Sequence, residues 1–302
     1  MLDQAENDGR LRPGMTVYEG TSGSTGIALA FQCLARGYKL HVVMPDDQAQ
    51  EKRSLLRKLG AEVTIVPSCA IANKDHYVNT ARRLAQEEGG FFVDQFENSN
   101  NGDAHYQKTA REIWKQTQGT LNCFVMSAGT GGTIAGISRY LKERNISIRV
   151  VLADPSGSSL CNKVRHNVCY TVEQAERKVR KHRYDSIVEG VGLDRVTANF
   201  SKALLDDAYE VKDQTLLNMA HALLHLEGLF VGSSSALNLA VACKVARVLP
   251  EGSTVVTIIC DNGSRHLSRF WNEEFIASAG LSWPTNPHDG SKKFWQDVIS
   301  NA

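Results

Sequence analysis

Short apolar, β-branched runs alternate with longer amphipathic segments along most of this chain. The runs predict strands, and the spacing between them predicts crossover helices that join strands of a parallel sheet. In the first hundred residues we expect strands at 16–19, 39–44, 62–66 and 91–93. We expect helices at 2–8, 24–36, 48–59 and 73–88. This alternation is typical of an α/β protein.

The alternation continues beyond residue 100 with one interruption. We expect strands at 121–126, 147–152, 208–211 and 254–260, and helices at 103–118, 132–144, 199–206, 213–227, 233–248 and 266–277. The pattern is lost over 156–198, where residues 177–183 form a dense basic run. A solvated surface is the first interpretation of that run, and a rim that attracts an anionic substrate is the second. The polar stretch 98–102 predicts a boundary between a domain of residues 1–100 and one of residues 101–302.

Composition excludes several classes of function. The 302 residues suffice for two domains, and 34 basic against 33 acidic side chains leave a net charge of +1. Such a balance argues against nucleic acid or an anionic membrane as a partner. No uncharged apolar run approaches the roughly 18 residues of a membrane span. The seven cysteines show no CxxC spacing, which predicts reduced thiols in an intracellular protein and no cysteine metal site.

A first loop of small, hydroxylated residues runs from Thr21 to Gly26, between a predicted strand and a predicted helix. Such a turn presents backbone N–H groups, hydroxyl groups and the positive end of the helix dipole to one point. It therefore predicts a site for an anion, either a carboxylate or a phosphate. An ordinary βα turn with a Ser or Thr cap is the alternative.

A second loop of similar chemistry runs from Ser127 to Thr133, again between a strand and a helix. Its three glycines remove the Cβ obstruction, so that several N–H groups can converge on a phosphate at the helix N-terminus. No lysine follows the last glycine, so the loop is not a P-loop. A tight structural turn is the alternative interpretation.

Six motifs in order resemble the cysteine synthase branch of the fold-type II pyridoxal-phosphate (PLP) enzymes. That family also includes cystathionine β-synthase and, more distantly, serine/threonine dehydratases. The motifs are Thr21–Gly26, Asp94–Asn98, Gly129–Thr133, Glu189–Gly192, Gly232–Ser235 and Cys260–His266. The resemblance covers residues 1 to about 275, and the order of the motifs is far more specific than any one of them.

The resemblance implies a tryptophan synthase β-like fold with two mainly parallel sheets flanked by helices and PLP in the cleft between the domains. Residues 1–100 would be the smaller substrate-loop domain, and 101–302 the larger domain that binds the PLP phosphate. The implied substrate-binding residues are Thr21, Ser22, Ser24, Thr25 and Gln95. The implied cofactor-binding residues are Ser24, Gly129, Thr130, Gly131, Gly132, Thr133, Gly232 and Asn262.

The implied reaction is the replacement of the β-substituent of O-acetylserine by sulfide, which gives cysteine. A neutral partner for the pyridine nitrogen, at the Asp261-Asn262 position, favours β-elimination over chemistry that needs a full electron sink. The alternatives are cystathionine synthesis, serine/threonine deamination, and a non-catalytic module that binds PLP, an amino acid or an acyltransferase. The resemblance further suggests a homodimer without a metal. We expect a cytoplasmic location, with a mitochondrial one as the alternative.

Three positions depart from the family pattern. Ser24 stands where the family usually has Asn, Asn262 stands where it usually has Ser at the pyridine nitrogen, and Ala236 replaces a Gly. Ser24 is too short to make the contact of that Asn with the ring hydroxyl of the cofactor. We interpret these differences as variation that a branch of the family tolerates.

The Schiff-base lysine of the family lies in a Lys-Asp-Arg motif upstream of the helix that corresponds to residues 2–8. The printed sequence has its first lysine at Lys39 and no such motif; Lys74-Asp75-His76, in a predicted helix, is no substitute. No catalytic residue is therefore assigned, and this chain alone is expected to hold PLP noncovalently with little or no turnover. Two explanations stay open: a shortened form of a full enzyme, without the family's N-terminal strands, or a pseudoenzyme.

Overall fold

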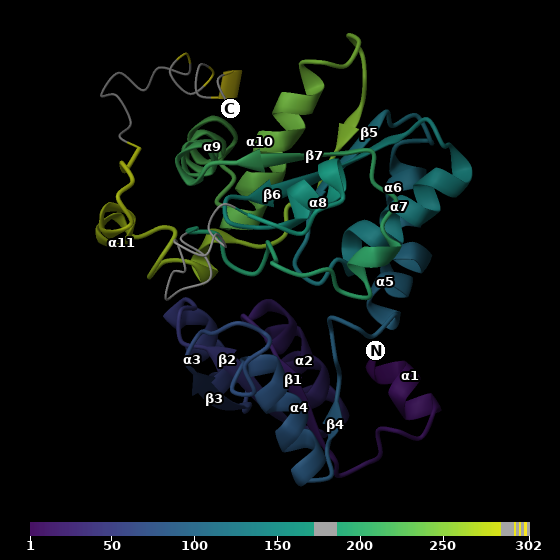
Figure 1. Ribbon diagram of the computed structural model, residues 1–302, viewed down its shortest axis with the longest axis vertical. Helices are drawn as coiled ribbons and strands as arrows, with labels where there is room; N and C mark the ends of the chain where they lie inside the picture. Colours follow the sequence, from purple (N-terminus) through teal and green to yellow (C-terminus); the bar gives the residue numbers. More distant parts are fainter. Residues whose placement is uncertain (172–185, 285–292, 294–295, 297–298, 301–302) are drawn as a thin grey trace. The chain divides into compact units, whose positions relative to one another are not determined.

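The computed structural model describes residues 1–171 and 186–284, together with 293, 296, 299 and 300, and Figure 1 shows the course of the chain. Two compact units are formed, one by Met1–Asn101 and the other by the described residues from Gly102 onward. Each unit contains a four-stranded parallel sheet with helices packed against it. The predicted α/β class with two parallel sheets is confirmed. The basic run at 177–183 lies outside the described residues.

The first unit alternates strands and helices. Its strands are β1 (Thr16–Gly20), β2 (Lys39–Pro45), β3 (Glu62–Val66) and β4 (Phe91–Phe92). Its helices are α1 (Leu2–Asn7), α2 (Ser24–Arg36), α3 (Gln50–Lys58) and α4 (Tyr77–Glu87). The strand order is β3-β2-β1-β4 with every pair parallel. Apolar residues of α1, α2 and the strands share one core, which includes Leu2, Val17, Ile27 and Val42.

The second unit repeats this design at larger size. Its strands are β5 (Cys123–Ser127), β6 (Arg149–Pro155), β7 (Asp207–Val211) and β8 (Val255–Val256). Its α-helices are α5 (Asn100–Ala104), which begins in the first unit, α6 (Ala110–Gln116), α7 (Gly132–Arg144), α8 (Leu160–His166), α9 (Asp213–Glu227), α10 (Ser233–Ala246) and α11 (Glu273–Ser278). Three short turns are η1 (His105–Thr109), η4 (Phe200–Lys202) and η5 (Gly263–Arg265). Helices α9 and α10 are almost wholly apolar toward the core.

The two sheets share one topology. The second sheet has the order β7-β6-β5-β8, again with parallel pairs only. In each sheet the chain starts on an inner strand, β1 or β5, proceeds outward through two strands, and returns to add a fourth strand on the other side of the first. The strand order therefore reverses beside β1 in one unit and beside β5 in the other. Ligands of open α/β sheets bind beyond the carboxyl ends of the strands at such a reversal.

Several predicted elements were wrong in extent or kind, and one helix was not predicted. The strand expected at 254–260 is limited to β8, and the helix expected at 199–206 is the single turn η4, whose Phe200 N–H bonds to the Thr197 hydroxyl. The helix expected at 266–277 begins only at α11, where the Asn272 side chain caps it by accepting from Phe275 N at 2.7 Å. Helix α8 lies in the stretch where the periodicity predicted no regular element.

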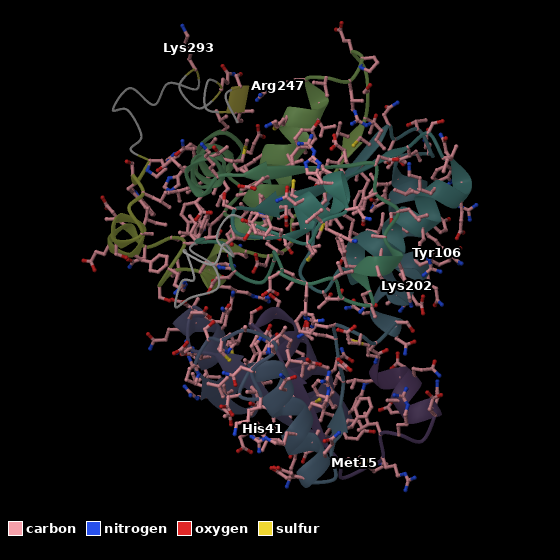
Figure 2. All side chains as sticks on the ribbon, in the orientation of Figure 1. Met15, His41, Tyr106, Lys202, Arg247 and Lys293 are labelled. Carbon is pink, nitrogen blue, oxygen red and sulfur yellow. The ribbon has the colours of Figure 1, made fainter. Side chains whose placement is uncertain are left out.

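The helix expected at 103–118 is continuous but irregular. Its middle turn, η1, is π-helical and is flanked by α5 and α6. Tyr106 of this turn, labelled in Figure 2, packs edge-on against Tyr140 of α7 with ring centroids 5.4 Å apart. Single π-helical turns are frequent at functional sites because they redirect the side chains they carry.

Two absences concern the described residues only. No helix within them is long and apolar enough to cross a membrane. No group of three or more His, Cys, Asp or Glu side chains within them could hold a metal ion. All seven cysteines are free thiols.

Candidate functional site

The two loops singled out by the sequence occupy equivalent places in the two units. Residues 21–23 connect β1 to α2, and residues 128–131 connect β5 to α7. Both loops thus lie at the carboxyl end of the strand beside which the strand order reverses. The repeated topology gives each unit a candidate ligand site of its own.

The first loop is held rigid by its own hydroxyl group and by the neighbouring strand. Thr21 N–H donates to the Val43 carbonyl at 3.0 Å, and Thr21 Oγ1 accepts from Gly23 N at 3.0 Å. Thr21 is buried, Ser22 and Thr25 are half-buried, and Ser24 is exposed. Helix α2 begins at Ser24 without a side-chain cap. Its first N–H groups and the nearby hydroxyls therefore suit an anion.

Gln95 joins this loop from the segment after β4. Thr25 Oγ1 donates to Gln95 Oε1 at 2.5 Å, and Gln95 Nε2 donates to the Gly20 carbonyl at 2.7 Å and to Glu19 Oε1 at 3.3 Å. The two amide protons and the amide oxygen are thereby all engaged within the unit. The structure brings Gln95 to the loop, where its contacts fix Thr25.

Glu19 is a fully buried carboxyl group directly beneath the loop. Its Oε2 accepts from Gln95 N at 3.2 Å, and none of its surface is exposed. Burial raises the pKa of Glu19 to about 8; the hydrogen bonds from Gln95 oppose this shift and the nearby charge of Asp94 adds to it. The neutral acid therefore predominates at pH 7.

The second loop is shaped by close backbone approaches. A Cβ on Gly129 would lie 2.2 Å from the Gly190 carbonyl oxygen, and one on Gly131 would lie 2.6 Å from Phe200 Cα. Gly131 also has φ +86°, and it precedes α7, which has no side-chain cap. Only glycine fits at these two positions. The resulting donors are N–H groups of the α7 N-terminus with the hydroxyl groups of Thr130 and Thr133.

Thr133 is positioned by a histidine from the π-helical turn. Thr133 Oγ1 lies 3.2 Å from His105 Nε2, and His105 Nδ1 lies 3.1 Å from Thr109 Oγ1. Burial lowers the pKa of His105, so the ring is neutral near pH 7 and carries one N–H group. In the tautomer that donates from Nε2, the Thr133 O–H group is available for a ligand. A phosphate group fits this arrangement, because N–H and hydroxyl donors surround the start of α7.

The N-terminus of α10 is bonded to two other segments of the second unit. Gly232 precedes this helix, which has no side-chain cap. Ser233 Oγ accepts from Glu189 N at 3.4 Å, and Ser235 Oγ accepts from Cys260 N at 2.8 Å. These contacts attach the start of α10 to the loop after Ser186 and to the segment before η5.

Asp261 and Asn262 face different surroundings. Asn262 is exposed, and its Oδ1 caps η5 by accepting from Ser264 N at 2.8 Å, which leaves Nδ2 as a donor. Asp261 Oδ2 instead lies 2.8 Å from His266 Nε2 in a part-buried contact. Of the two residues at the expected pyridine-nitrogen position, the structure presents only the neutral one outward.

Lys74, whose surroundings resemble the Lys-Asp-Arg motif of the family only poorly, does not lie in the predicted helix. Lys74 is exposed in a turn before α4, and not in a helix. Its exposure adds no argument for a covalent role.

Sequence reasoning gave no role to four residues that shape these two sites. They are Glu19, His105, Asn238 and His266. The last is one of the quoted motif residues but had no role. Asn238 of α10 is fully buried and accepts from Ser127 N at 2.7 Å, next to the second loop. A polar residue within an otherwise apolar helix was the available signal for Asn238, since buried polar groups need partners.

Comparison with known proteins agrees with these features. A family model described as "Pyridoxal-phosphate dependent enzyme" matches residues 1–261. The chain is 50% identical over 295 residues to cysteine synthase 2 of Neurospora crassa, covering 93% of this chain and 64% of that protein. It is 48% identical over 293 residues to cysteine synthase 2 of Schizosaccharomyces pombe, covering 93% and 74%. The chain thus spans just under two thirds of the length of the Neurospora relative.

A solved structure shows the same fold. The chain superimposes on the O-acetylserine-dependent cystathionine β-synthase of Helicobacter pylori with a TM-score of 0.77 and 31% sequence identity, covering 88% of this chain and 81% of the other. The predicted tryptophan synthase β-like fold and the sequence resemblance are both confirmed by these matches.

Proposed function

The chain belongs to the family of pyridoxal-phosphate dependent enzymes, and from this premise we propose that it serves cysteine synthesis from O-acetylserine and sulfide. The observation that carries the proposal is the pair of uncapped helix N-termini at the two sheet reversals. One is surrounded by hydroxyl groups suited to a carboxylate, and the other by glycines and threonines suited to a phosphate ester. An amino acid and PLP present these two groups.

The second unit would hold the cofactor. The N–H groups and hydroxyls of Gly129–Thr133 would bind the phosphate, and Gly232 would border the ring. The exposed amide of Asn262 would donate to the ring nitrogen, since its oxygen already caps η5. When bound, PLP supplies an electron-withdrawing ring that makes the β-substituent of an amino acid a leaving group.

The first unit would hold the substrate. Thr21, Ser22, Ser24 and Thr25 bind its α-carboxylate at the start of α2. Gln95 assists by fixing the Thr25 side chain, because its own amide protons are used by Gly20 and Glu19. No residue of the printed sequence is assigned to the Schiff-base role.

Turnover is tested with the natural gene product, supplied with PLP, O-acetylserine and sulfide. The expected product is cysteine, and a Ser22→Ala variant should raise the KM for O-acetylserine about tenfold, since one hydrogen bond to a charged group is lost. A Thr120→Val variant, changed at an exposed threonine of the second unit, is the control. Absence of cysteine formation by that gene product would refute the assignment.

Cystathionine synthesis is the second candidate, favoured by the likeness to the Helicobacter pylori enzyme. A single assay with sulfide and homocysteine in competition separates the two, because each gives a different product. Serine and threonine offered in place of O-acetylserine test the deaminase alternative. A protein that binds PLP and amino acids by calorimetry without any product would be the non-catalytic module. The homodimer and the cytoplasmic or mitochondrial location stay predictions.

A further inference from the structure

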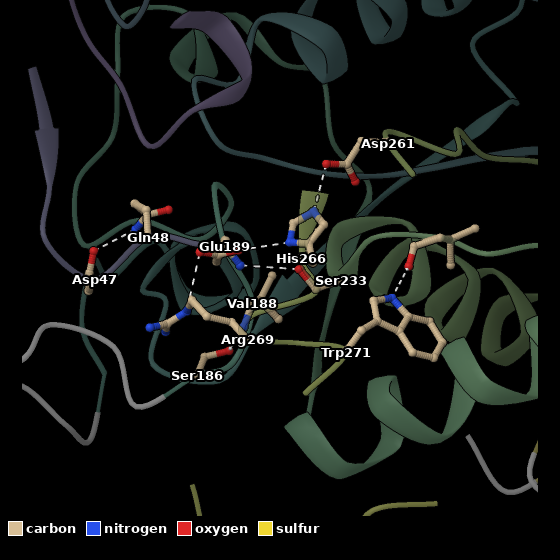
Figure 3. Close-up of polar contacts among 11 residues, drawn as sticks. Asp47, Gln48, Ser186, Val188, Glu189, Ser233, Asp261, His266, Arg269 and Trp271 are labelled. Carbon is tan, nitrogen blue, oxygen red and sulfur yellow. Dashed lines mark hydrogen bonds and ion pairs between the residues drawn. The ribbon is translucent and has the colours of Figure 1, made fainter. Parts of the chain in front are cut away.

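Four charged side chains gather in the second unit, and Figure 3 shows them around His266. His266 Nδ1 lies 2.9 Å from Glu189 Oε2, and its Nε2 lies 2.8 Å from Asp261 Oδ2. Arg269 Nε lies 3.4 Å from Glu189 Oε1. The side chains of His266, Glu189 and Asp261 are only 3%, 2% and 10% exposed. The proposed function uses none of these four side chains.

The two short contacts define the charge of the ring. A neutral imidazole has one N–H group and donates to one acceptor. Where both carboxylates are ionised, both ring nitrogens must donate to them, and His266 is then a cation. In that state the cluster, with Arg269, contains two positive and two negative charges. A buried set of ions is tolerable only when it is balanced and hydrogen-bonded in this way.

The cluster connects three segments of the chain. Glu189 N donates to Ser233 Oγ at the start of α10, and Gly232 N donates to the Asp261 carbonyl at 3.1 Å. A Cβ on Gly232 would lie 2.0 Å from Asp261 Oδ1. His266 thus fixes the Glu189 loop, the Gly232 turn and the Asp261-Asn262 step together. The proposed function puts the latter two beside the cofactor ring.

The contact with His266 determines where the Asp261 carboxylate points. Its Oδ2 is bound to the imidazole, and its Oδ1 is buried without a hydrogen-bond partner among the described residues. An unpartnered carboxylate oxygen is costly to bury. Without His266, the Asp261 carboxylate would be better solvated if its side chain rotated toward the solvent-exposed side, where Asn262 lies.

We propose that His266 is a positioning residue that holds the Asp261 carboxylate inward, so that the neutral amide of Asn262 alone faces the cofactor ring. This inference rests on the proposed binding of PLP in the second unit. A neutral donor stabilises an unprotonated ring nitrogen, whereas a carboxylate stabilises a positively charged one. His266 would thereby set which charge state of the cofactor the protein prefers.

The test compares binding of PLP and of N1-methyl-PLP, whose ring nitrogen is permanently positive and accepts no hydrogen bond. Equilibrium dialysis gives both dissociation constants at pH 7. The wild-type protein should prefer PLP at least tenfold. In His266→Phe the preference should fall tenfold or more, because the released Asp261 attracts the methylated ring. In His266→Phe/Asp261→Asn the wild-type preference should return.

The controls separate this role from a structural one. His221→Phe changes another buried histidine of the same unit, on α9, and should leave the preference unchanged. Burial lowers the pKa of His221 to about 4, so this replacement removes no charge at pH 7. If His266→Phe fails to fold by circular dichroism, His266→Gln is measured in its place, because an amide cannot donate in two opposite directions.

Three negative results have different meanings. An unchanged preference in the folded His266 variant, with PLP still bound, would overturn this inference and leave the proposed function standing. Failure of the wild-type protein to bind PLP at all would overturn the proposed function itself. A shift in the preference that persists in the double variant would also contradict the role given to Asp261.

Discussion

At the scale of single residues, the candidate site depends on buried polar groups that have partners. The side-chain amide of Gln95 is fully used in hydrogen bonds to Glu19, Gly20 and Thr25. Gln95 therefore shapes the first loop and has no amide proton left for a ligand. Glu19 in turn is neutral at pH 7 because burial raises its pKa. The proposed binding of a carboxylate at this loop would gain from this neutrality, since an ionised Glu19 beneath the loop would repel the ligand.

Glu19 makes the stability of the protein depend on pH. Its pKa of about 8 lies above the usual 4.5, so the folded state binds the proton more tightly. The stability that this proton confers is complete below about pH 4.5 and is lost as the pH rises through 8. The loss amounts to at most about 1.4 kcal/mol per pH unit. Urea unfolding at pH 6 and pH 9 measures it.

A Glu19→Gln variant should show a smaller fall in the free energy of unfolding between these pH values than the wild type. Glu62→Gln, at a side chain that is 73% exposed, should behave like the wild type. Equal falls in the wild type and Glu19→Gln would show that Glu19 titrates normally in the folded protein.

At the scale of elements, helix packing positions the second loop, Ser127–Thr133. Helix α7 begins at this loop and packs on the irregular helix α5–η1. The contact is close at Gly136, where a Cβ would lie 2.2 Å from the Gly102 carbonyl oxygen. The π-helical turn places His105 against Thr133. The geometry of the loop therefore depends on the contacts of Gly136 with Gly102 and of Thr133 with His105.

Gly136→Ala should separate α7 from α5–η1. We expect a loss of about 1–3 kcal/mol in the free energy of unfolding, as for other overpacked positions, and weaker PLP binding. Gly102→Ala is a matched control, because its Cβ would meet nothing closer than 3.6 Å. Chemical denaturation and PLP titration measure both effects. Equal stability of the two variants would show that the packing adjusts without cost.

Sequence patterns predicted the regular elements well and the irregular ones poorly. Helices α2, α7 and α9 have the predicted bounds, since their apolar periodicity is strong and glycine follows α2 and α9. The residues from His266 to Asn272 have helical composition but form turns, because the side chain of His266 is held by Glu189 and Asp261. Such distant partners leave no local signal, which is also why the role of His266 was missed.

At the scale of the whole molecule, one topology occurs twice. Each unit has a parallel sheet whose strand order reverses beside the first strand of that unit. A loop with N–H and hydroxyl donors suited to an anion follows this strand. The sequence motifs predicted both loops, and the family resemblance assigned the phosphate to the second and the carboxylate to the first. The structure adds that the donors of each loop are oriented by residues outside the motifs, Glu19 in one unit and His105 in the other.

The central claim, that the loop Gly129–Thr133 binds the PLP phosphate, is tested most directly by titrating PLP and pyridoxal into the protein. Pyridoxal lacks only the phosphate group. We predict that PLP binds at least ten times more tightly than pyridoxal. Thr133→Val should weaken PLP about tenfold and leave pyridoxal unchanged, since it removes one charge-assisted hydrogen bond. Equal affinities for PLP and pyridoxal in the wild-type protein would contradict the claim.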